Sequence, residues 1–220
     1  MHSAVTVGID PDGPCEREPD GLTSRRAPPT GVTDTLAVTD GRVLTPEFDV
    51  IRADVLIDAD AGEIVEVAPD LAGDADETID AAGGLVMPGL VNAHGHATMT
   101  LLRGYADDKN LEDWLQEDIW PAEAELTAED VAVGTRLAAV ELIRSGTTAF
   151  ADMYFHVAEV VEAVREAGLR ARVGHGVVTV GKDEAAARDD FAESLAVAEA
   201  HDGAADGRIR TAVMPHAPHT

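Results

Sequence analysis

The sequence predicts an α/β fold with a parallel sheet, preceded by a smaller β segment. Between residues 34 and 85, short runs of alternating apolar and polar residues are separated by turn residues, which is typical of β-strands. From residue 86 onward, apolar strand-like runs alternate with helix-like stripes, and four such strands are visible. Repeated βα units imply parallel strands joined by right-handed crossovers. Histidines lie at or near the end of each of these strands, so the polar groups are expected to meet at one rim of the sheet.

Three regions are expected along the chain. Residues 1–33 are rich in proline and lack hydrophobic periodicity, so we expect a disordered extension. Residues 34–85 are expected to form a β-sandwich segment. In it, residues 36–44 contain a strand, a turn and the start of a second strand, and residues 54–58 and 63–67 form a hairpin. Residues 86–220 are expected to form the four βα units.

The elements of the third region follow from their residue patterns. After the first strand at 86–96, further strands are expected at 147–152, 171–178 and 209–215. Residues 111–124 are expected to be helical in part and broken at Pro121. Thr127 and Asp130 form a capping box that begins one helix, and Gly168 ends another. The apolar stripes of the three helices are expected at Val133, Leu137 and Val140; at Val157, Val160, Val161 and Val164; and at Ala187, Phe191, Leu195 and Ala198.

The charge balance excludes several kinds of partner. Acidic residues number 42 against 16 basic ones, which gives a net charge of −26. Such a surface repels nucleic acid and anionic membranes, so neither is an expected partner. Concentrated salt relieves this self-repulsion, because the screening length falls to roughly 3 Å at 1 M. We therefore hypothesise a halophilic protein, with a merely acidic mesophilic enzyme as the alternative.

The cysteine content and the hydrophobic pattern indicate a cytoplasmic protein. Cys15 is the only cysteine, so an internal disulfide is impossible and a reducing compartment fits. The sequence shows no apolar run of about 18–20 residues and no signal-peptide pattern at its N-terminus.

Two histidines end the first strand-like run of the third region. If residues 86–96 form a strand, His94 and His96 lie on the same face, because side chains two residues apart point the same way. Neutral imidazole is a good zinc ligand, so this pair is a candidate metal site that needs further ligands. The alternative is a pair of ordinary histidines at a strand end.

Further histidines are expected near the same rim. They are His156, His175, His216 and His219. Taken one at a time, the pattern favours a structural interpretation of three of them: His156 caps a helix, His175 is a satisfied strand residue and His219 is simply exposed. His216 follows Pro215 and precedes Pro218 by two residues, and these prolines would hold its loop in a fixed geometry.

At these residues the sequence resembles a known family. Residues 88–96, PGLVNAHGH, resemble the first-strand metal motif of the amidohydrolase superfamily. Residues 99–108, 114–115, 119–123 and 145–155, with the ending at 215–220, are similar to 5-methylthioadenosine/S-adenosylhomocysteine deaminases, which usually carry tyrosine in place of His219. The resemblance implies the N-terminal half of a (β/α)8 TIM-type barrel.

The resemblance also implies roles for individual residues. His94 and His96 match metal ligands, and the metal is expected to be divalent, with zinc as the first choice. Glu123 matches a glutamate that binds ribose hydroxyls, although the pattern alone suits a solvated glutamate at a helix end. His216 matches a histidine that contacts the nucleoside. His175 falls where many relatives carry an arginine for the carboxylate tail of S-adenosylhomocysteine, and an imidazole cannot form that bidentate fork.

The implied activity is metal-dependent hydrolytic deamination of an adenosine-type nucleoside: 5-methylthioadenosine, S-adenosylhomocysteine or adenosine. The proton-shuttling glutamate, a further histidine and a ligand aspartate are expected beyond residue 220, so the chain is expected to be an incomplete fragment without catalytic residues of its own. One alternative is a non-catalytic remnant or interaction protein that pairs with a complementary half. Another is an amidohydrolase acting on guanine, cytosine or a triazine. A homo-oligomer is a further expectation.

Overall fold

The computed structural model describes residues 5–8, 34–180 and 182–216. The chain divides into two compact units, Met1–Leu90 and Val91–Thr220, and each is described by itself. Most of the extension expected to be disordered lies outside the described residues. Val5–Gly8 is the exception: it forms strand β1, which pairs antiparallel with β6. The prediction of disorder is therefore wrong for these four residues, in which the consecutive β-branched side chains of Val5, Thr6 and Val7 favour a strand.

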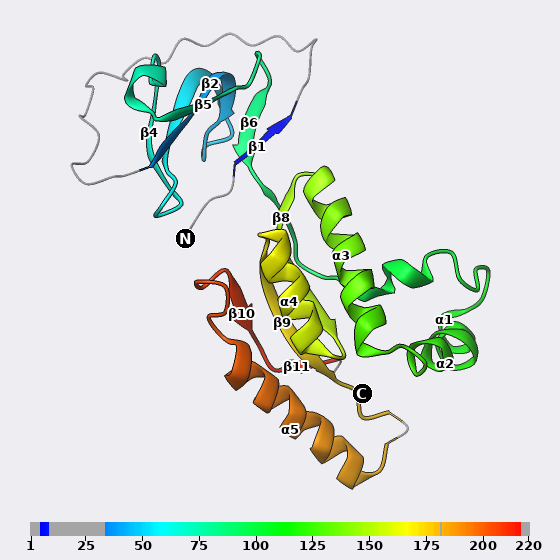
Figure 1. The fold of residues 1–220 in the computed structure, drawn as a ribbon. Helices are drawn as coiled ribbons and strands as arrows, with labels where there is room; N and C mark the ends of the chain where they lie inside the picture. The colour runs from blue at the N-terminus through cyan, green and yellow to red at the C-terminus, as the bar shows by residue number, and fades with distance from the viewer. Residues whose placement is uncertain (1–4, 9–33, 181, 217–220) are drawn as a thin grey trace. The chain divides into compact units, whose positions relative to one another are not determined.

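The first unit is built on one mixed sheet (Figure 1). Its strands follow the order β1-β6-β2-β3-β4, with β5 paired to β2. Besides β1, the elements are β2 Thr35–Leu44, β3 Val50–Asp58, β4 Glu63–Ala68, the 3-10 turn Ala72–Asp74, β5 Glu77–Asp80 and β6 Leu85–Pro88. One face of the sheet buries Val38, Val43, Ala53, Val55, Ala81 and Val86 as a continuous core.

The hairpin expected in this unit is confirmed, and the expected turn in residues 36–44 is not. Strands β3 and β4 are antiparallel, and Asp58 pairs with Glu63 across the turn. Strand β2 instead runs unbroken, and its register against β3 shifts between Val38 and Gly41. One extra residue is accommodated there as a bulge, with Asp40 at a φ of 50°. The turn residues of the sequence therefore bend a single strand.

The second unit is an α/β structure with parallel strands, as the sequence predicts. Its sheet order is β10-β9-β8-β7; β9 is parallel to β8 and β10, and also to β11, which lies off that order. The strands are β7 Leu90–Asn92, β8 Thr147–Tyr154, β9 Arg170–Val177, β10 Ile209–Thr211 and β11 Met214–Pro215. The helical elements are the 3-10 helix Ala97–Leu102, α1 Leu111–Asp113, the π-helix Trp114–Ile119, α2 Trp120–Glu123, α3 Ala128–Arg144, α4 Val157–Ala167 and α5 Glu184–His201.

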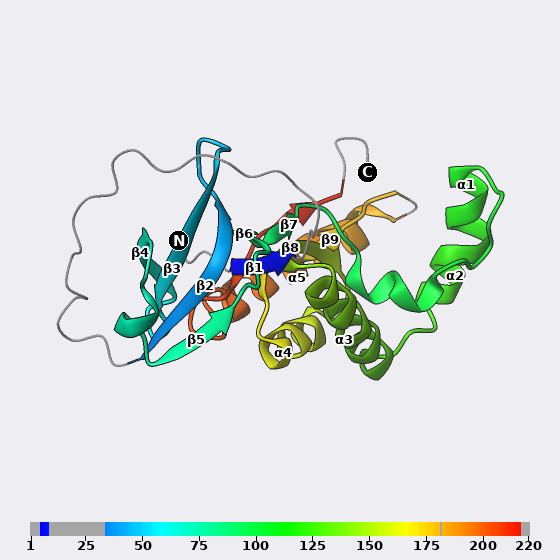
Figure 2. The ribbon, with the colours of Figure 1, turned by 90° about the horizontal axis from the view of Figure 1, so that it is seen from above.

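Helices α3 and α4 lie side by side (Figures 1 and 2). The capping box is confirmed: the Thr127 hydroxyl accepts from the Asp130 amide, and Asp130 accepts from the Thr127 amide. The valine stripe of α4 is buried as predicted, and Gly168 ends that helix with a φ of 76°. None of the described helices is long and apolar enough to cross a membrane.

Two of the three predicted apolar stripes are wrong. Val133, Leu137 and Val140 of α3 are 50%, 43% and 54% exposed. Apart from Val131, the buried residues of α3 are small, namely Gly134, Thr135, Ala138 and Ala139. The helix packs closely on the 3-10 helix, since a Cβ at Gly134 would lie 2.7 Å from the Thr98 carbonyl oxygen. In α5, Ser194 is the one residue buried, while the predicted Phe191 and Leu195 are exposed.

The expected break at Pro121 is also absent. The helical run continues to Glu123, and Pro121 lies in the first turn of α2. A π-helical turn precedes it, closed by the amide of Trp120 donating to the Leu115 carbonyl. Proline lacks an amide hydrogen, and it is tolerated here because the first turn of a helix leaves its amides without intrahelical partners.

The fourth predicted strand is present in two pieces, β10 and β11, separated by two residues. Ala212, between them, donates its amide to the Val173 carbonyl at 3.1 Å. A Cβ on Gly174 would lie 2.3 Å from the Ala212 oxygen, so only glycine permits this approach.

Candidate functional site

The two histidines of the candidate metal pair lie in a loop. Strand β7 ends at Asn92, so the strand geometry expected to align His94 and His96 is not what brings them together. Their rings are nevertheless adjacent, with centroids 5.2 Å apart and planes at 82°. The Asn92 side chain accepts from the His94 amide at 3.3 Å, which ties the loop to the end of its strand.

A hydrogen bond to β8 fixes the orientation of His96. Its Nδ1 lies 2.8 Å from the carbonyl oxygen of Met153. A carbonyl only accepts, so Nδ1 carries the hydrogen and Nε2 keeps its lone pair. In metal sites, a histidine typically binds the metal through one ring nitrogen while the other nitrogen donates to a carbonyl or carboxylate, as Nδ1 of His96 does here.

Asp152, on β8, holds the end of the loop that carries His94 and His96. Its side chain is buried, with the residue 2% exposed, and Oδ1 accepts from the Ala97 amide at 2.6 Å. Oδ2 is also buried and has no hydrogen-bond partner within the described part of the chain. Burial raises the pKa of Asp152 to about 6, and the Ala97 amide and His96 partly offset this effect. Asp152 is not among the site residues that the sequence predicts; an acidic residue near the C-terminal end of a predicted parallel strand is the signal that points to it.

His94 and His96 are the candidate metal ligands of the sequence, and their rings lie next to each other. Among the residues that the structure describes, no group of three or more histidines, cysteines, aspartates or glutamates is arranged to hold a metal ion. The chemistry of the pair fits zinc, which binds imidazole nitrogens, but a catalytic zinc site uses about three protein ligands. The pair stays a candidate for part of a metal site, and further ligands would have to complete it.

A cavity of about 700 Å³ opens beside His96. It brings together three of the predicted site residues, namely His96, Glu123 and His216. The rest of its lining is mainly apolar and aromatic: Met99, Leu111, Glu112, Trp114, Leu115, Gln116, Ile119, Trp120, Met153, Tyr154, Phe155, Gly176, Val178 and Val180. A large apolar cavity with a few convergent polar groups is the usual form of a small-molecule site.

Glu123 lies at the end of α2 and is half-buried in the wall of this cavity. The hydroxyl of Tyr154 donates to its Oε1 at 2.7 Å. Burial raises the pKa of Glu123, while the Tyr154 bond and the nearby His96 lower it. Glu123 is therefore held in place by β8 and is not a solvated residue at a helix end. Tyr154 was not predicted as a site residue, since the chain pattern shows it only as the end of a strand.

The remaining histidines are placed differently. His175 is buried on β9, facing α5, with Nε2 3.4 Å from Asp190, and it does not line the cavity. His156 occupies the position before α4 with a φ of 49° and makes no capping hydrogen bond. His156 lines a second pocket of about 340 Å³, which shares Glu123 and Tyr154 with the first. His219 lies outside the described residues.

The sequence of this second unit matches a known family. A sequence model of the amidohydrolase family matches residues 85–220. The chain belongs to the amidohydrolase family. This confirms the resemblance found in the residues around His94 and His96.

Two curated relatives and one solved structure place the chain within the amidohydrolases. It is 66% identical over 182 residues to a 5-methylthioadenosine/S-adenosylhomocysteine deaminase of Natronomonas pharaonis, covering 83% of this chain and 42% of that protein. It is 51% identical to a 5'-deoxyadenosine deaminase of Methanococcoides burtonii, covering 84% of this chain and 43% of the relative. An adenosine deaminase from Xanthomonas campestris, solved with bound zinc, superposes with a TM-score of 0.71 at 36% identity, covering 84% of this chain and 43% of the other. The chain thus spans less than half the length of each.

Proposed function

We propose that this chain supplies metal ligands and a nucleoside-binding wall to an amidohydrolase that deaminates an adenosine-type nucleoside. The observation that carries the proposal is the single cavity lined by His96, Glu123 and His216. Similarity to proteins named as deaminases of adenosine-type nucleosides supports this choice over guanine, cytosine or a triazine. The substrates considered are 5-methylthioadenosine, S-adenosylhomocysteine and adenosine.

Glu123 and the apolar walls provide complementary contacts for a nucleoside. A carboxylate accepts hydrogen bonds only, so it suits the two hydroxyl groups of a ribose. Tyr154 occupies one acceptor position of Oε1 and leaves the others for a ligand. Trp114 and Trp120 offer aromatic surface to a purine ring, and His216 adds a polar contact from the segment after β11.

His94 and His96 would hold the metal, which we propose to be zinc. The ion supplies Lewis acidity that makes water a stronger nucleophile toward C6 of the adenine ring. In the overall reaction, water adds at C6 and ammonia leaves, giving the inosine-type product. This chain's part is to bind and orient the nucleoside, to hold His96 through the Met153 carbonyl, and to hold the next residue, Ala97, through Asp152. The proton-shuttling glutamate stays a prediction for the part of the relatives that this chain does not span.

The test combines zinc binding with nucleoside binding in the purified chain at high salt. We expect zinc binding that is lost in His94→Ala and in His96→Ala and kept in His201→Ala, a control at the end of α5. We expect nucleoside binding to weaken in Glu123→Gln, because the amide replaces an acceptor oxygen with a donor. Ammonia release from 5-methylthioadenosine is measured in parallel.

A folded chain that binds no adenosine-type nucleoside would refute this proposal. Stronger binding of guanine or a triazine would move the assignment to another amidohydrolase substrate. Zinc binding that survives both histidine substitutions would remove the metal site from this loop. The cytoplasmic location, the homo-oligomer and the absence of nucleic-acid and membrane partners stay predictions.

A further inference from the structure

The cavity wall supplied by this chain is negatively charged and apolar. Two carboxylates, Glu112 and Glu123, line it, and the described lining contains neither lysine nor arginine. The remaining polar side-chain groups are the two imidazoles, the Gln116 amide, the Tyr154 hydroxyl and the indole N–H groups of Trp114 and Trp120. A ligand carboxylate placed in this cavity would therefore meet two like charges.

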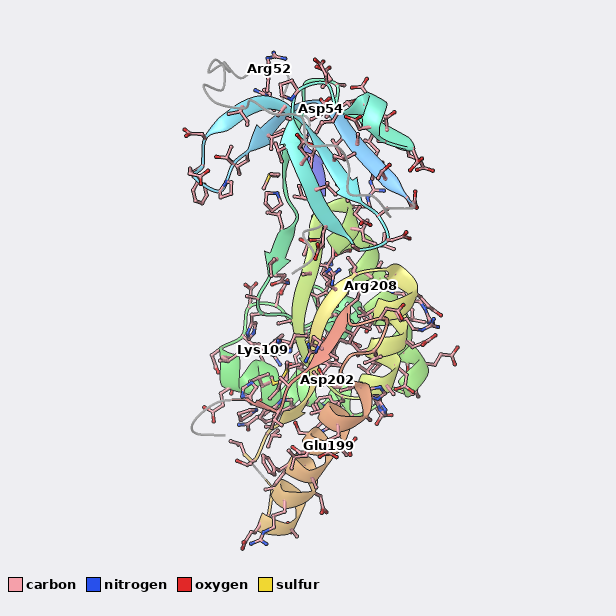
Figure 3. All side chains as sticks on the ribbon, turned by 90° about the vertical axis from the view of Figure 1, so that its left-hand side faces the viewer. Arg52, Asp54, Lys109, Glu199, Asp202 and Arg208 are labelled. Atoms are coloured by element: carbon pink, nitrogen blue, oxygen red, sulfur yellow. The ribbon has the colours of Figure 1, made fainter. Side chains whose placement is uncertain are left out.

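The cations on the segments that flank the cavity wall are already engaged by acidic residues. Lys109 (Figure 3), just before α1, pairs with Glu117 at 3.1 Å and with Asp118. Lys182 pairs with Asp190 at 2.7 Å, and Arg188 pairs with Glu184 at 2.5 Å. Recruiting any of them to a ligand would break an existing ion pair and leave its acidic partner without a cation.

His175 is also directed to a protein carboxylate. It is buried between β9 and α5, where its two ring nitrogens lie 3.4 Å from Asp190 and 4.0 Å from Glu193. Both nitrogens therefore face carboxylates of α5, and His175 does not line the cavity. His175 thus supplies no positive charge to a ligand that fills the cavity.

From this wall we infer that the site selects nucleosides with an uncharged, apolar 5' substituent and discriminates against one that carries an amino acid. The inference rests on the proposed function. A buried carboxylate without a partner is costly, because it loses its hydration and gains no compensating contact. The ammonium group of an S-linked amino acid has Glu112 as a partner, but its carboxylate has neither a lysine nor an arginine to pair with among the described lining residues. A methylthio group or a methyl group instead fits the apolar side chains Leu111, Leu115, Val178 and Val180.

The two tryptophans of the chain provide a direct readout of cavity occupancy. Trp114 and Trp120 are the only tryptophans, and both line the cavity. Their fluorescence is titrated at high salt with 5-methylthioadenosine, 5'-deoxyadenosine and S-adenosylhomocysteine. We expect the first two to bind at least about tenfold more tightly than the third, because only the third brings a carboxylate to be desolvated. Equal affinities for all three ligands would overturn the inference and leave the proposed function standing.

A pair of variants at Val180 tests the electrostatic cause. Val180 is half-exposed on the loop after β9, so a longer side chain can be accommodated there. Val180→Arg is expected to tighten S-adenosylhomocysteine binding several-fold, whereas Val180→Met, with a long neutral side chain, is expected to keep the discrimination. The inference would also be overturned if Val180→Arg still binds 5-methylthioadenosine but the ratio of its affinities for 5-methylthioadenosine and S-adenosylhomocysteine stays as in the wild-type chain. Loss of all nucleoside binding in the wild-type chain would instead refute the proposed function.

Discussion

The hydroxyl of Tyr154 donates a hydrogen bond to Oε1 of Glu123 across 2.7 Å, joining the end of β8 to the end of α2. Tyr154 is 4% exposed, and burial together with the neighbouring Glu123 carboxylate raises its pKa well above its usual value. It therefore remains a hydrogen-bond donor at any ordinary pH. The bond fixes one oxygen of Glu123, whose side chain lines the cavity.

Tyr154→Phe is expected to weaken nucleoside binding about fivefold, since a hydrogen bond to a carboxylate contributes about 1 kcal/mol or more. The ring still fills its buried place, so the fold is expected to be kept. Dissociation constants are measured by tryptophan fluorescence. Tyr105→Phe is the matched control, because Tyr105 is half-exposed and its side chain takes no part in the bond to Glu123. Equal losses in the two variants would show that Tyr154 does not position Glu123.

The site shows what a single sequence can and cannot predict. His96, Glu123 and His216 were predicted through their motifs, and the structure places all three on one cavity. Tyr154 and Asp152 were missed because their roles depend on contacts with Glu123 and Ala97, which lie 31 and 55 residues away in the chain. Such long-range contacts leave no periodic signal. The alignment of His94 and His96 was predicted from strand geometry, whereas a loop provides it.

The helices show a related limit. The stripe of α4 was predicted correctly because large valines face the sheet there. In α3 the large residues Val133 and Leu137 are exposed, and the buried face carries Gly134 and Ala138. Hydrophobic periodicity identifies the helix face that carries the largest apolar side chains. Where two backbones pack closely, as at Gly134, the buried face instead carries small side chains. The sequence alone does not show which of the two applies.

Gly174→Ala is expected to destabilise the chain by about 1–3 kcal/mol, because the new methyl group must displace the backbone at Ala212. The change is measured by denaturant unfolding at constant high salt. Gly73→Ala is the control, since a Cβ there meets nothing within 4 Å. Similar stability of both variants would show that β9 tolerates a side chain at residue 174. The close approach of Ala212, between β10 and β11, to Gly174 would then not explain why a glycine occupies residue 174.

Asp202 is expected to make folding depend on pH under acidic conditions. Arg210 and the Thr211 amide hold the pKa of this carboxyl at about 2, below its usual value of 3.8 (Figure 3). A lowered pKa in the folded state means that the stabilisation is complete above pH 3.8 and is lost as the pH falls toward 2. In Asp202→Asn the free energy of unfolding is expected to depend less on pH between about 2 and 4. Asp206→Asn, at an exposed residue of the same turn, is expected to leave this dependence unchanged. An unchanged pH profile in Asp202→Asn would contradict the assignment.

Salt is expected to stabilise the folded chain. The net charge of −26 produces repulsion that the surface ion pairs offset only in part, and the 66% identical relative comes from a haloarchaeon, Natronomonas pharaonis. Raising KCl screens this repulsion, so the melting temperature is expected to rise with salt concentration. Glu199→Lys, on the exposed side of α5 (Figure 3), is expected to lower the salt needed for half-unfolding, and Glu199→Gln to lower it by about half as much, since it removes one charge and not two. A melting temperature that is constant or falls with added KCl would contradict the halophilic assignment and favour a merely acidic enzyme.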